Sequence, residues 1–169
     1  MLALLLMMVG IIFRFIPHMP NITPVAAIAL FGAMNLPNRR LGLIMPLALM
    51  ITSDLFLGLH NVVAFTWGAT VLVSIIGLLL KNTKKTTAVI GGSLAASVVF
   101  FIVTNFGVWM MGWYPRTAEG LTQCYIAGIP FFRNFLAGTL VYAAALFGAY
   151  AVAAKSLKNT KLAHALLSR

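Results

Sequence analysis

Acidic side chains are nearly absent from this chain of 169 residues, which contains only Asp54 and Glu119. Charged residues of both signs make up 8% of the sequence, far below the roughly 25% that is typical of a soluble domain. Hydrophobic residues make up 62%, and the mean hydropathy is +1.01. This composition excludes an ordinary soluble domain and indicates that the lipid bilayer is the solvent of the protein.

Cysteine is almost absent as well, because Cys124 is the single one and no internal disulfide can form. The sequence lacks H-E-x-x-H, Walker A and G-x-G-x-x-G motifs and any Ser, His and Asp set at catalytic spacing. We therefore expect no enzyme and no resident cofactor, with an intramembrane thiol enzyme at Cys124 as an alternative. The net charge of +10 does not predict nucleic-acid binding, because the basic residues stand singly or in short clusters between apolar segments.

Apolar segments run almost from end to end, which predicts one transmembrane domain over residues 1–169. Six of them are bounded by proline, asparagine or basic residues, at about 1–16, 24–36, 41–58, 62–80, 87–112 and 129–154. The first segment lacks the basic start and cleavage site of a signal peptide, so we expect it to be retained. The predicted fold is an all-α integral membrane bundle of six transmembrane helices, in which segment 24–36 is short enough to be tilted or re-entrant.

The basic residues predict the orientation of this bundle. Nine of the twelve lie in the breaks 37–40 and 81–86 and in the tail: Arg39, Arg40, Lys81, Lys84, Lys85, Lys155, Lys158, Lys161 and Arg169. The positive-inside rule places this side, with both termini, in the cytoplasm. Small residues at helical spacing, Ala29 with Ala33 and Ala145 with Ala149 and Ala153, are expected to pack inside the bundle, with a docking face for a partner as the alternative.

Three connections remain for the outer side, at residues 14–24, 54–61 and 113–134, and they hold most of the chemically distinctive side chains. Asp54 is costly near the membrane, so it either pairs with Arg14 or Arg133 or accepts a hydrogen bond from a substrate. The candidate substrate-binding residues are His18, Asn21, Asp54, His60, Asn105, Trp109, Tyr114, Arg116, Glu119, Gln123, Cys124 and Arg133.

Each kind of side chain in this set has a chemical reason. Asn105 is an amide within an apolar run, one helical turn before Trp109. Trp109 and Tyr114 either stack on a planar ligand or belong to an interfacial aromatic belt, and Arg116 or Arg133 would lie near an anionic group of that ligand. Two histidines and Cys124 are residue types that ligate transition metals, but their spacing matches no compact motif, so we predict no metal site.

Four stretches carry a family resemblance: R-F-I-P-H-M-P-N-I-T-P-V-A-A-I-A-L-F-G-A, S-D-L-F-L-G-L-H, T-N-F-G-V-W and Y-P-R-T-A-E-G-L-T-Q-C-Y-I-A-G-I-P-F-F-R-N. Together they resemble an uncharacterised family of small bacterial membrane proteins described as transport proteins. That family is similar to the substrate-binding S-components of energy-coupling factor (ECF) vitamin transporters. The resemblance covers nearly the whole chain.

This resemblance implies a six-helix protein of the bacterial cytoplasmic (inner) membrane that captures a vitamin or cofactor precursor beneath the loops after helices 1, 3 and 5. An ECF energising module, a membrane subunit with two ATPases, would be its partner. The A-x-x-x-A pattern typical of module docking is missing from the first segment. A solitary transporter, similar to those that bind cobalamin through a cysteine, is therefore the alternative, and it would use Cys124.

Overall fold

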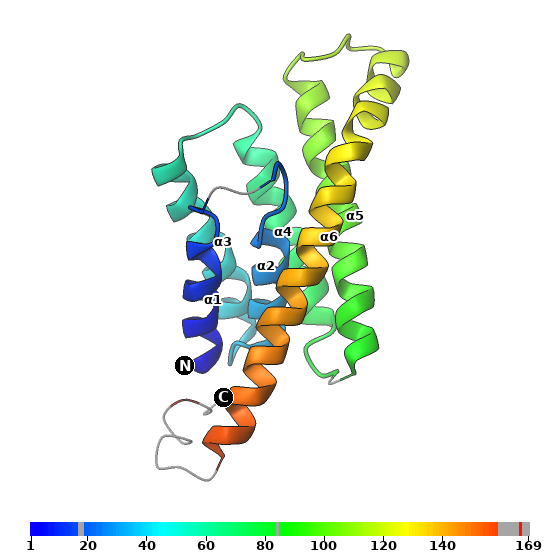
Figure 1. Cartoon of the computed structure of the whole chain (residues 1–169). Helices are drawn as coiled ribbons and strands as arrows, with labels where there is room; N and C mark the ends of the chain where they lie inside the picture. The colour runs from blue at the N-terminus through cyan, green and yellow to red at the C-terminus, as the bar shows by residue number, and fades with distance from the viewer. Residues whose placement is uncertain (17–18, 84, 159–165, 167–169) are drawn as a thin grey trace.

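The computed structural model describes residues 1–16, 19–83, 85–158 and 166, and all regular structure in this part of the chain is α-helical. The helices are α1 (Leu2–Ile12), α2 (Val25–Asn35), α3 (Arg39–Leu57), α4 (Val63–Leu79), α5 (Thr86–Met110) and α6 (Ala118–Leu157). Successive helices run antiparallel, so α1 begins and α6 ends at the same end of the molecule (Figure 1). The all-α prediction is confirmed.

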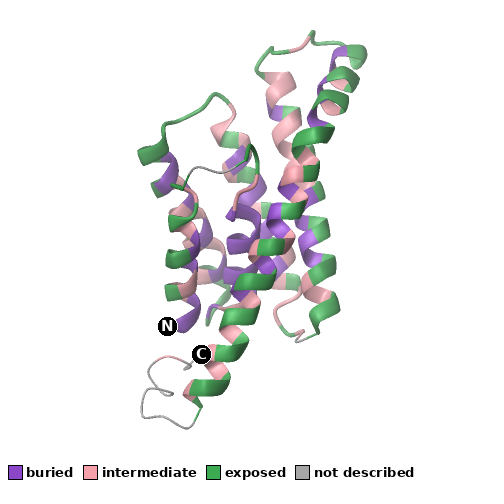
Figure 2. Cartoon of the chain, in the orientation of Figure 1, coloured by how far each residue is buried: buried purple, intermediate pink, exposed green. Residues whose placement is uncertain are grey.

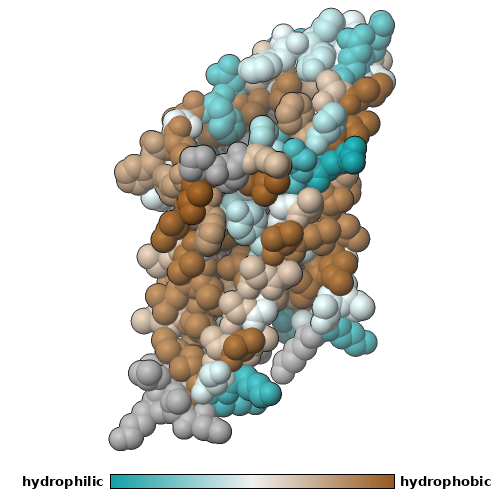
Figure 3. Space-filling view, viewed as in Figure 1, coloured by the Kyte–Doolittle hydropathy of each residue, from teal (hydrophilic) through white to brown (hydrophobic). Residues whose placement is uncertain are grey.

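Three of these helices, α3, α5 and α6, are long and apolar enough to cross a membrane by length and composition. Helices α1, α2 and α4 are apolar but shorter. With 11 residues each, α1 and α2 are about 16 Å long, against about 30 Å for the hydrocarbon core of a bilayer. On the face shown in Figure 3, the surface between the two ends of the molecule is mostly hydrophobic. These features fit an α-helical membrane protein.

Helix α2 forms the centre of the bundle. Every residue from Val25 to Met34 is buried, and the helix lies between α1, α3, α4, α5 and α6 (Figure 2). A helix that is apolar all round is stable only when it is covered on every side. The shortness of segment 24–36 therefore has a structural explanation, because α2 is enclosed by protein and need not match the thickness of the lipid.

Close packing around α2 depends on small residues. Ala29 and Ala33 are fully buried, and a Cβ added at Gly77 would lie 2.7 Å from the Cβ of Ala33. The prediction of internal packing is confirmed for this pair. It is wrong for the stripe on α6, where Ala145 and Ala149 are exposed. The buried face of that part of α6 passes through residues 139, 143 and 146, which turns the stripe outward.

The prediction of a long loop over residues 113–134 is also wrong. Helix α6 begins at Ala118, because the Thr117 side chain caps it by accepting a 3.1 Å hydrogen bond from the Gly120 amide. Glu119 lies in the first turn, where its negative charge interacts favourably with the positive end of the helix dipole. Pro130 lies inside the helix without ending it. Only residues 111–117 connect α5 to α6.

Helix α6 has 40 residues and is therefore about 60 Å long. Its first turns and the last turns of α5 form a hairpin that projects beyond the other four helices (Figure 1). We call residues 109–123 the hairpin tip. The outer end of the molecule thus has two levels, a lower one formed by the ends of α1, α3 and α4 and a higher one formed by the hairpin tip.

Candidate binding site

Arg14 and Asp54 form an ion pair at the outer end of α3. The chain continues beyond α1 in tight turns, in which the amides of residues 13–15 each bond to the carbonyl three residues earlier. These turns bring the Arg14 guanidinium over α3, with Nη2 2.8 Å from Asp54 Oδ1. Arg14 Nη1 donates to Ser53 Oγ and, at 3.1 Å, to Met50 Sδ. The predicted ion pair of Asp54 is confirmed, and its partner is Arg14.

The second carboxylate oxygen of Asp54 is also satisfied. Trp67 Nε1, on α4, donates to Asp54 Oδ2 at 2.8 Å. Asp54 is only 1% exposed, and a carboxylate at that depth is stable only when its oxygens have partners. We call Arg14, Asp54 and Trp67 the buried charge network. Trp67 is not among the residues predicted from the sequence. The only signal there is that a tryptophan has a single N–H, which can bond to a buried acceptor.

A cavity of about 280 Å³ lies directly beside this network. It is lined by Arg14, Asn21, Thr23, Val25, Met50, Leu57, His60, Thr66, Phe100 and Phe135, and we call it the outer cavity. A neighbouring space of about 70 Å³, the side cavity, is lined by Asn21, Phe100, Phe101, Thr104, Asn105, Phe131, Phe132 and Phe135. The two share three lining residues, and the rings of Phe100 and Phe135 stack there with centroids 4.6 Å apart.

The segment before α2 forms one wall of both cavities and is fixed to α6. Asn21 has a positive φ of 63°, a conformation that asparagine tolerates better than most residues. Asn134 Nδ2 donates to the Pro20 carbonyl at 3.2 Å. A Cβ added at Gly138 would lie 3.1 Å from the Cα of Ile22, so the absence of a side chain there allows close approach. The Asn21 side chain is therefore held at the cavities by contacts from a helix more than 100 residues away.

Asn105 and Cys124 lie where α5 crosses α6. The Asn105 side chain lines the side cavity and donates through Nδ2 to the Phe101 carbonyl at 2.9 Å. Cys124 is buried, and its thiol donates to the backbone carbonyl of Asn105 at 3.3 Å. Cys124 does not line the outer or the side cavity. Within the described ranges, no three His, Cys, Asp or Glu side chains are grouped to hold a metal ion.

The remaining predicted residues lie elsewhere. At the hairpin tip, Trp109 Nε1 donates to the Pro115 carbonyl at 2.9 Å, and Arg116 Nη2 donates to the Met110 carbonyl at 2.9 Å. Five of the candidates lie there and line neither cavity: Trp109, Tyr114, Arg116, Glu119 and Gln123. Arg133 is exposed on α6 and lines neither cavity, and His18 lies outside the described residues.

The structure thus brings Asn21, His60 and Asn105 to the cavities, with Asp54 behind Arg14. Asp54 balances the charge of Arg14, so this pair adds no net charge to the outer cavity. The cavity still presents hydrogen-bond donors and acceptors. Thr66 donates its hydroxyl hydrogen to the Val63 carbonyl at 2.8 Å, so its oxygen is left as an acceptor.

Residues 1–162 match one family model over almost the whole chain. The chain belongs to the family of unknown function DUF6580. No curated protein and no solved structure matches the chain. This membership assigns no activity to the chain.

Proposed function

We propose that the protein is a substrate-binding membrane protein for the uptake of a small vitamin-like or cofactor-precursor-like molecule. The outer cavity is the binding site. One observation carries this proposal: polar side chains from separate segments, Arg14, Asn21 and His60, line one cavity together with the stacked rings of Phe100 and Phe135. A polar side chain that only stabilises an apolar bundle can be satisfied by one neighbouring group. Polar side chains that line the same cavity can instead contact one bound molecule together.

The size and charge of the outer cavity limit the ligand. Its volume of about 280 Å³ is close to the lower end of the roughly 300–1,000 Å³ usual for ligand pockets, so we infer a ligand of one or two rings. Phe100 and Phe135 provide an aromatic wall for a planar ring. The pairing of Arg14 with Asp54 favours a neutral or zwitterionic molecule over a second strong anion.

The proposed topology has six membrane spans and both termini in the cytoplasm of a bacterial inner membrane. The antiparallel order of the helices supports it, and so does the distribution of charge. Six described basic residues belong to the end opposite the outer cavity: Arg39, Arg40, Lys81, Lys85, Lys155 and Lys158. The positive-inside rule assigns such an end to the cytoplasm. The outer cavity would then face the outside, where a substrate for uptake arrives.

Energy for uptake would come from outside this chain. The sequence contains no nucleotide-binding motif. Because it resembles S-components of ECF transporters, we propose an energising module with ATPases as its partner. Because the A-x-x-x-A pattern is missing from α1, a solitary transporter is the alternative to a module-driven one.

The test is purification of the full chain, mass spectrometry of co-purified small molecules and thermal unfolding with a panel of vitamins and nucleobases. A ligand at about 100 times its Kd stabilises the protein by about 2.7 kcal/mol, a readily measured shift. We expect His60→Ala and Asn21→Gly to weaken binding about two- to tenfold, as for loss of one neutral hydrogen bond. The glycine retains the positive φ and removes only the amide.

Matched controls are Asn61→Ala, next to His60 but not lining the cavity, and Gln123→Ala at the hairpin tip. Both should bind the ligand as tightly as the unmodified chain, and so should Cys124→Ser, because Cys124 lines neither cavity. If Gln123→Ala weakens ligand binding as much as His60→Ala does, then the binding site lies at the hairpin tip instead. The absence of any co-purified ligand together with the absence of any thermal shift would contradict the proposal.

A further inference from the structure

The side cavity differs chemically from the outer cavity beside it. The two share Asn21, Phe100 and Phe135, so one ligand can reach both. Five of the eight residues that line the side cavity are phenylalanines, and none is charged. Thr104 and Asn105, on α5, line the side cavity but not the outer one. These two side chains therefore supply the polar contacts that are specific to the side cavity.

Thr104 and Asn105 each have an oxygen that is free to accept a hydrogen bond. Thr104 Oγ1 donates its only hydrogen to the Phe100 carbonyl at 2.8 Å, which leaves the oxygen as an acceptor. Asn105 Nδ2 donates to the Phe101 carbonyl at 2.9 Å, and this bond fixes the orientation of the amide. Across the part of the chain that the structure describes, no group donates to Asn105 Oδ1. The one buried side-chain atom without a partner there is Thr139 Oγ1, so Asn105 Oδ1 is not enclosed.

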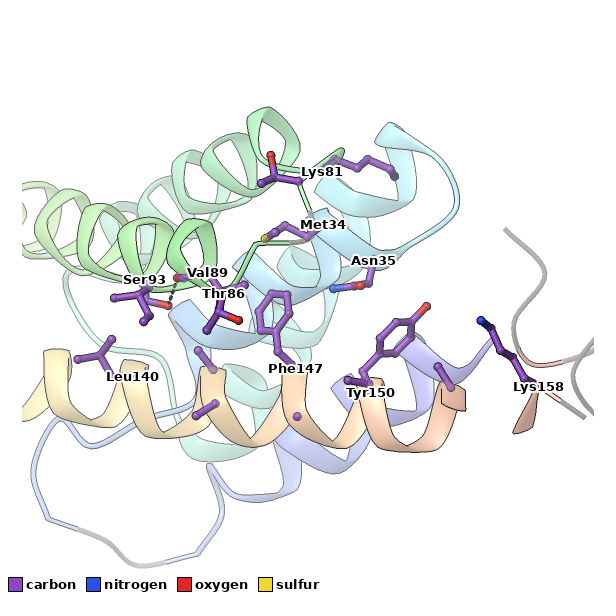
Figure 4. Close-up of a pocket in the computed structure, with 17 residues that line it drawn as sticks. Met34, Asn35, Lys81, Thr86, Val89, Ser93, Leu140, Phe147, Tyr150 and Lys158 are labelled. Atoms are coloured by element: carbon purple, nitrogen blue, oxygen red, sulfur yellow. Dashed lines mark hydrogen bonds between the residues drawn. The ribbon is translucent and has the colours of Figure 1, made fainter. Parts of the chain in front are cut away.

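A larger groove at the opposite end of the bundle has different walls. It has a volume of about 760 Å³ and lies between the end of α2, the first turns of α5 and the second half of α6 (Figure 4). Ser93 there donates to the Val89 carbonyl at 2.8 Å, as Thr104 does to Phe100 (Figure 4). Two lysines also line this groove, and an arginine and a histidine line the outer cavity. Of these three cavities, only the side cavity has no basic residue in its lining.

We propose that the side cavity binds an amino group of the ligand, and that the substrate is a planar heteroaromatic ring with an amino group beside a ring nitrogen. The two hydrogens of the amino group match the free oxygens of Thr104 and Asn105. The second N–H of Asn105 can donate to the ring nitrogen, the donor and acceptor pair that asparagine binds in adenine. A carbonyl substituent would instead place its lone pairs against those oxygens.

The size and the walls of the side cavity agree with this substituent. Its volume of about 70 Å³ exceeds the roughly 15 Å³ that one water molecule needs, but it is far below the roughly 300 Å³ of a small complete ligand pocket. The side cavity therefore holds a substituent, while the ring lies in the outer cavity. Aromatic faces attract N–H hydrogens, whereas a carboxylate or phosphate would meet no cationic side chain in this lining.

The test compares 2-aminopyrimidine with 2-methylpyrimidine, which have the same ring and nearly the same size and differ in whether the substituent donates. Affinities for the full chain in detergent are measured by saturation-transfer NMR titration at millimolar concentrations. We expect 2-aminopyrimidine to bind about five- to tenfold more tightly, because the methyl group leaves acceptors unpaired. Asn105→Leu retains the shape of the side chain and removes its oxygen, so it should reduce this preference to about twofold or less.

Thr104→Val removes the other acceptor and should also lower the preference for the amino compound. Thr122→Val is the matched control, because Thr122 likewise donates to the carbonyl four residues earlier but is exposed and lines neither cavity. It should keep the full preference. Equal binding of the two compounds by the unmodified chain would overturn the proposal, as would binding of neither compound. A preference that persists in both Asn105→Leu and Thr104→Val would overturn it as well.

This proposal rests on the function proposed for the outer cavity, and the two can fail separately. If the two pyrimidines bind equally and His60→Ala weakens both, then the outer cavity remains the binding site and only the amino-group site is wrong. If Asn105→Leu removes the preference while His60→Ala changes neither affinity, then the side cavity binds the amino compound but the outer cavity is not the substrate site.

Discussion

The buried charge network and the hairpin tip both hold arginine and tryptophan, but they use these residues over different distances in the sequence. In the network, Arg14 bonds to Ser53, 39 residues away, and Trp67 bonds to Asp54, 13 residues away. At the hairpin tip, Trp109 bonds to Pro115 and Arg116 bonds to Met110, and each pair is six residues apart. The network joins the segment after α1 to α3 and α4, whereas the side-chain hydrogen bonds of Trp109 and Arg116 stay within the tip.

This difference predicts different consequences for stability. Contacts between distant segments are lost only when the bundle opens, so weakening them should lower the global free energy of unfolding. Contacts within one turn can be lost while the rest of the bundle remains intact. The difference also bears on function, because the outer cavity is shaped by the network and by the segment around Asn21, both of which depend on the whole fold.

The largest effect should come from Asp54→Asn. The change leaves the Arg14 guanidinium, 13% exposed, without a counter-charge, and breaking a buried pair from one side costs about 3–5 kcal/mol. Thermal unfolding in detergent, followed by helical circular dichroism, measures the loss. Glu119→Gln is the control, because it removes the only other acidic side chain, which is exposed at the tip, and should change stability by no more than about 0.5 kcal/mol. Equal losses in the two variants would remove the distinction between the regions.

A smaller effect is expected from Trp67→Phe. This variant retains an aromatic ring and removes the donor to Asp54 Oδ2, and a hydrogen bond to a charged group contributes about 1.5–3 kcal/mol. The matched change at the tip is Trp109→Phe, which removes an exposed hydrogen bond from the half-buried Trp109 to the neutral Pro115 carbonyl. We expect the second variant to unfold globally like the unmodified chain. The comparison fails if Trp109→Phe is the more destabilised of the two in the same melting experiment.

Much of the fold could be predicted because apolar runs end at residues with clear physical reasons to stop a helix. Asn38 caps α3 through its side chain, and the break at 81–85 carries lysines that avoid the membrane core. The start of α6 was missed because a polar stretch with a proline resembles a loop. The Thr117 cap followed by Glu119 was the available signal of a helix start.

The candidate site could be predicted only in part, for a related reason. The cost of a carboxylate near lipid pointed to an ion pair for Asp54, but its bond from Trp67 depends on how α3 and α4 pack. Phe100 and Phe135 looked like ordinary membrane residues, since an aromatic side chain in an apolar run carries no mark of lining a cavity. Conversely, the predicted binding residues include several from the hairpin tip because they are polar or aromatic, although the structure shows that Trp109 and Arg116 there form only local side-chain hydrogen bonds.

The smallest effect concerns the backbone at Asn21, which has a positive φ of 63°. Asn21→Ala should destabilise the protein by about 1 kcal/mol, because the left-handed region costs an ordinary side chain about 1–2 kcal/mol and asparagine less. Asn21→Gly should leave stability within a few tenths of a kcal/mol in the same melting experiment, since glycine adopts this conformation freely. If both variants lose ligand but only the alanine variant loses stability, then the amide acts on the ligand and the backbone on the fold. Equal destabilisation by alanine and glycine would instead mean that the Asn21 side chain itself stabilises the outer cavity. Asn21 would then contribute to global stability, like the long-range contacts of the buried charge network, and not to ligand binding.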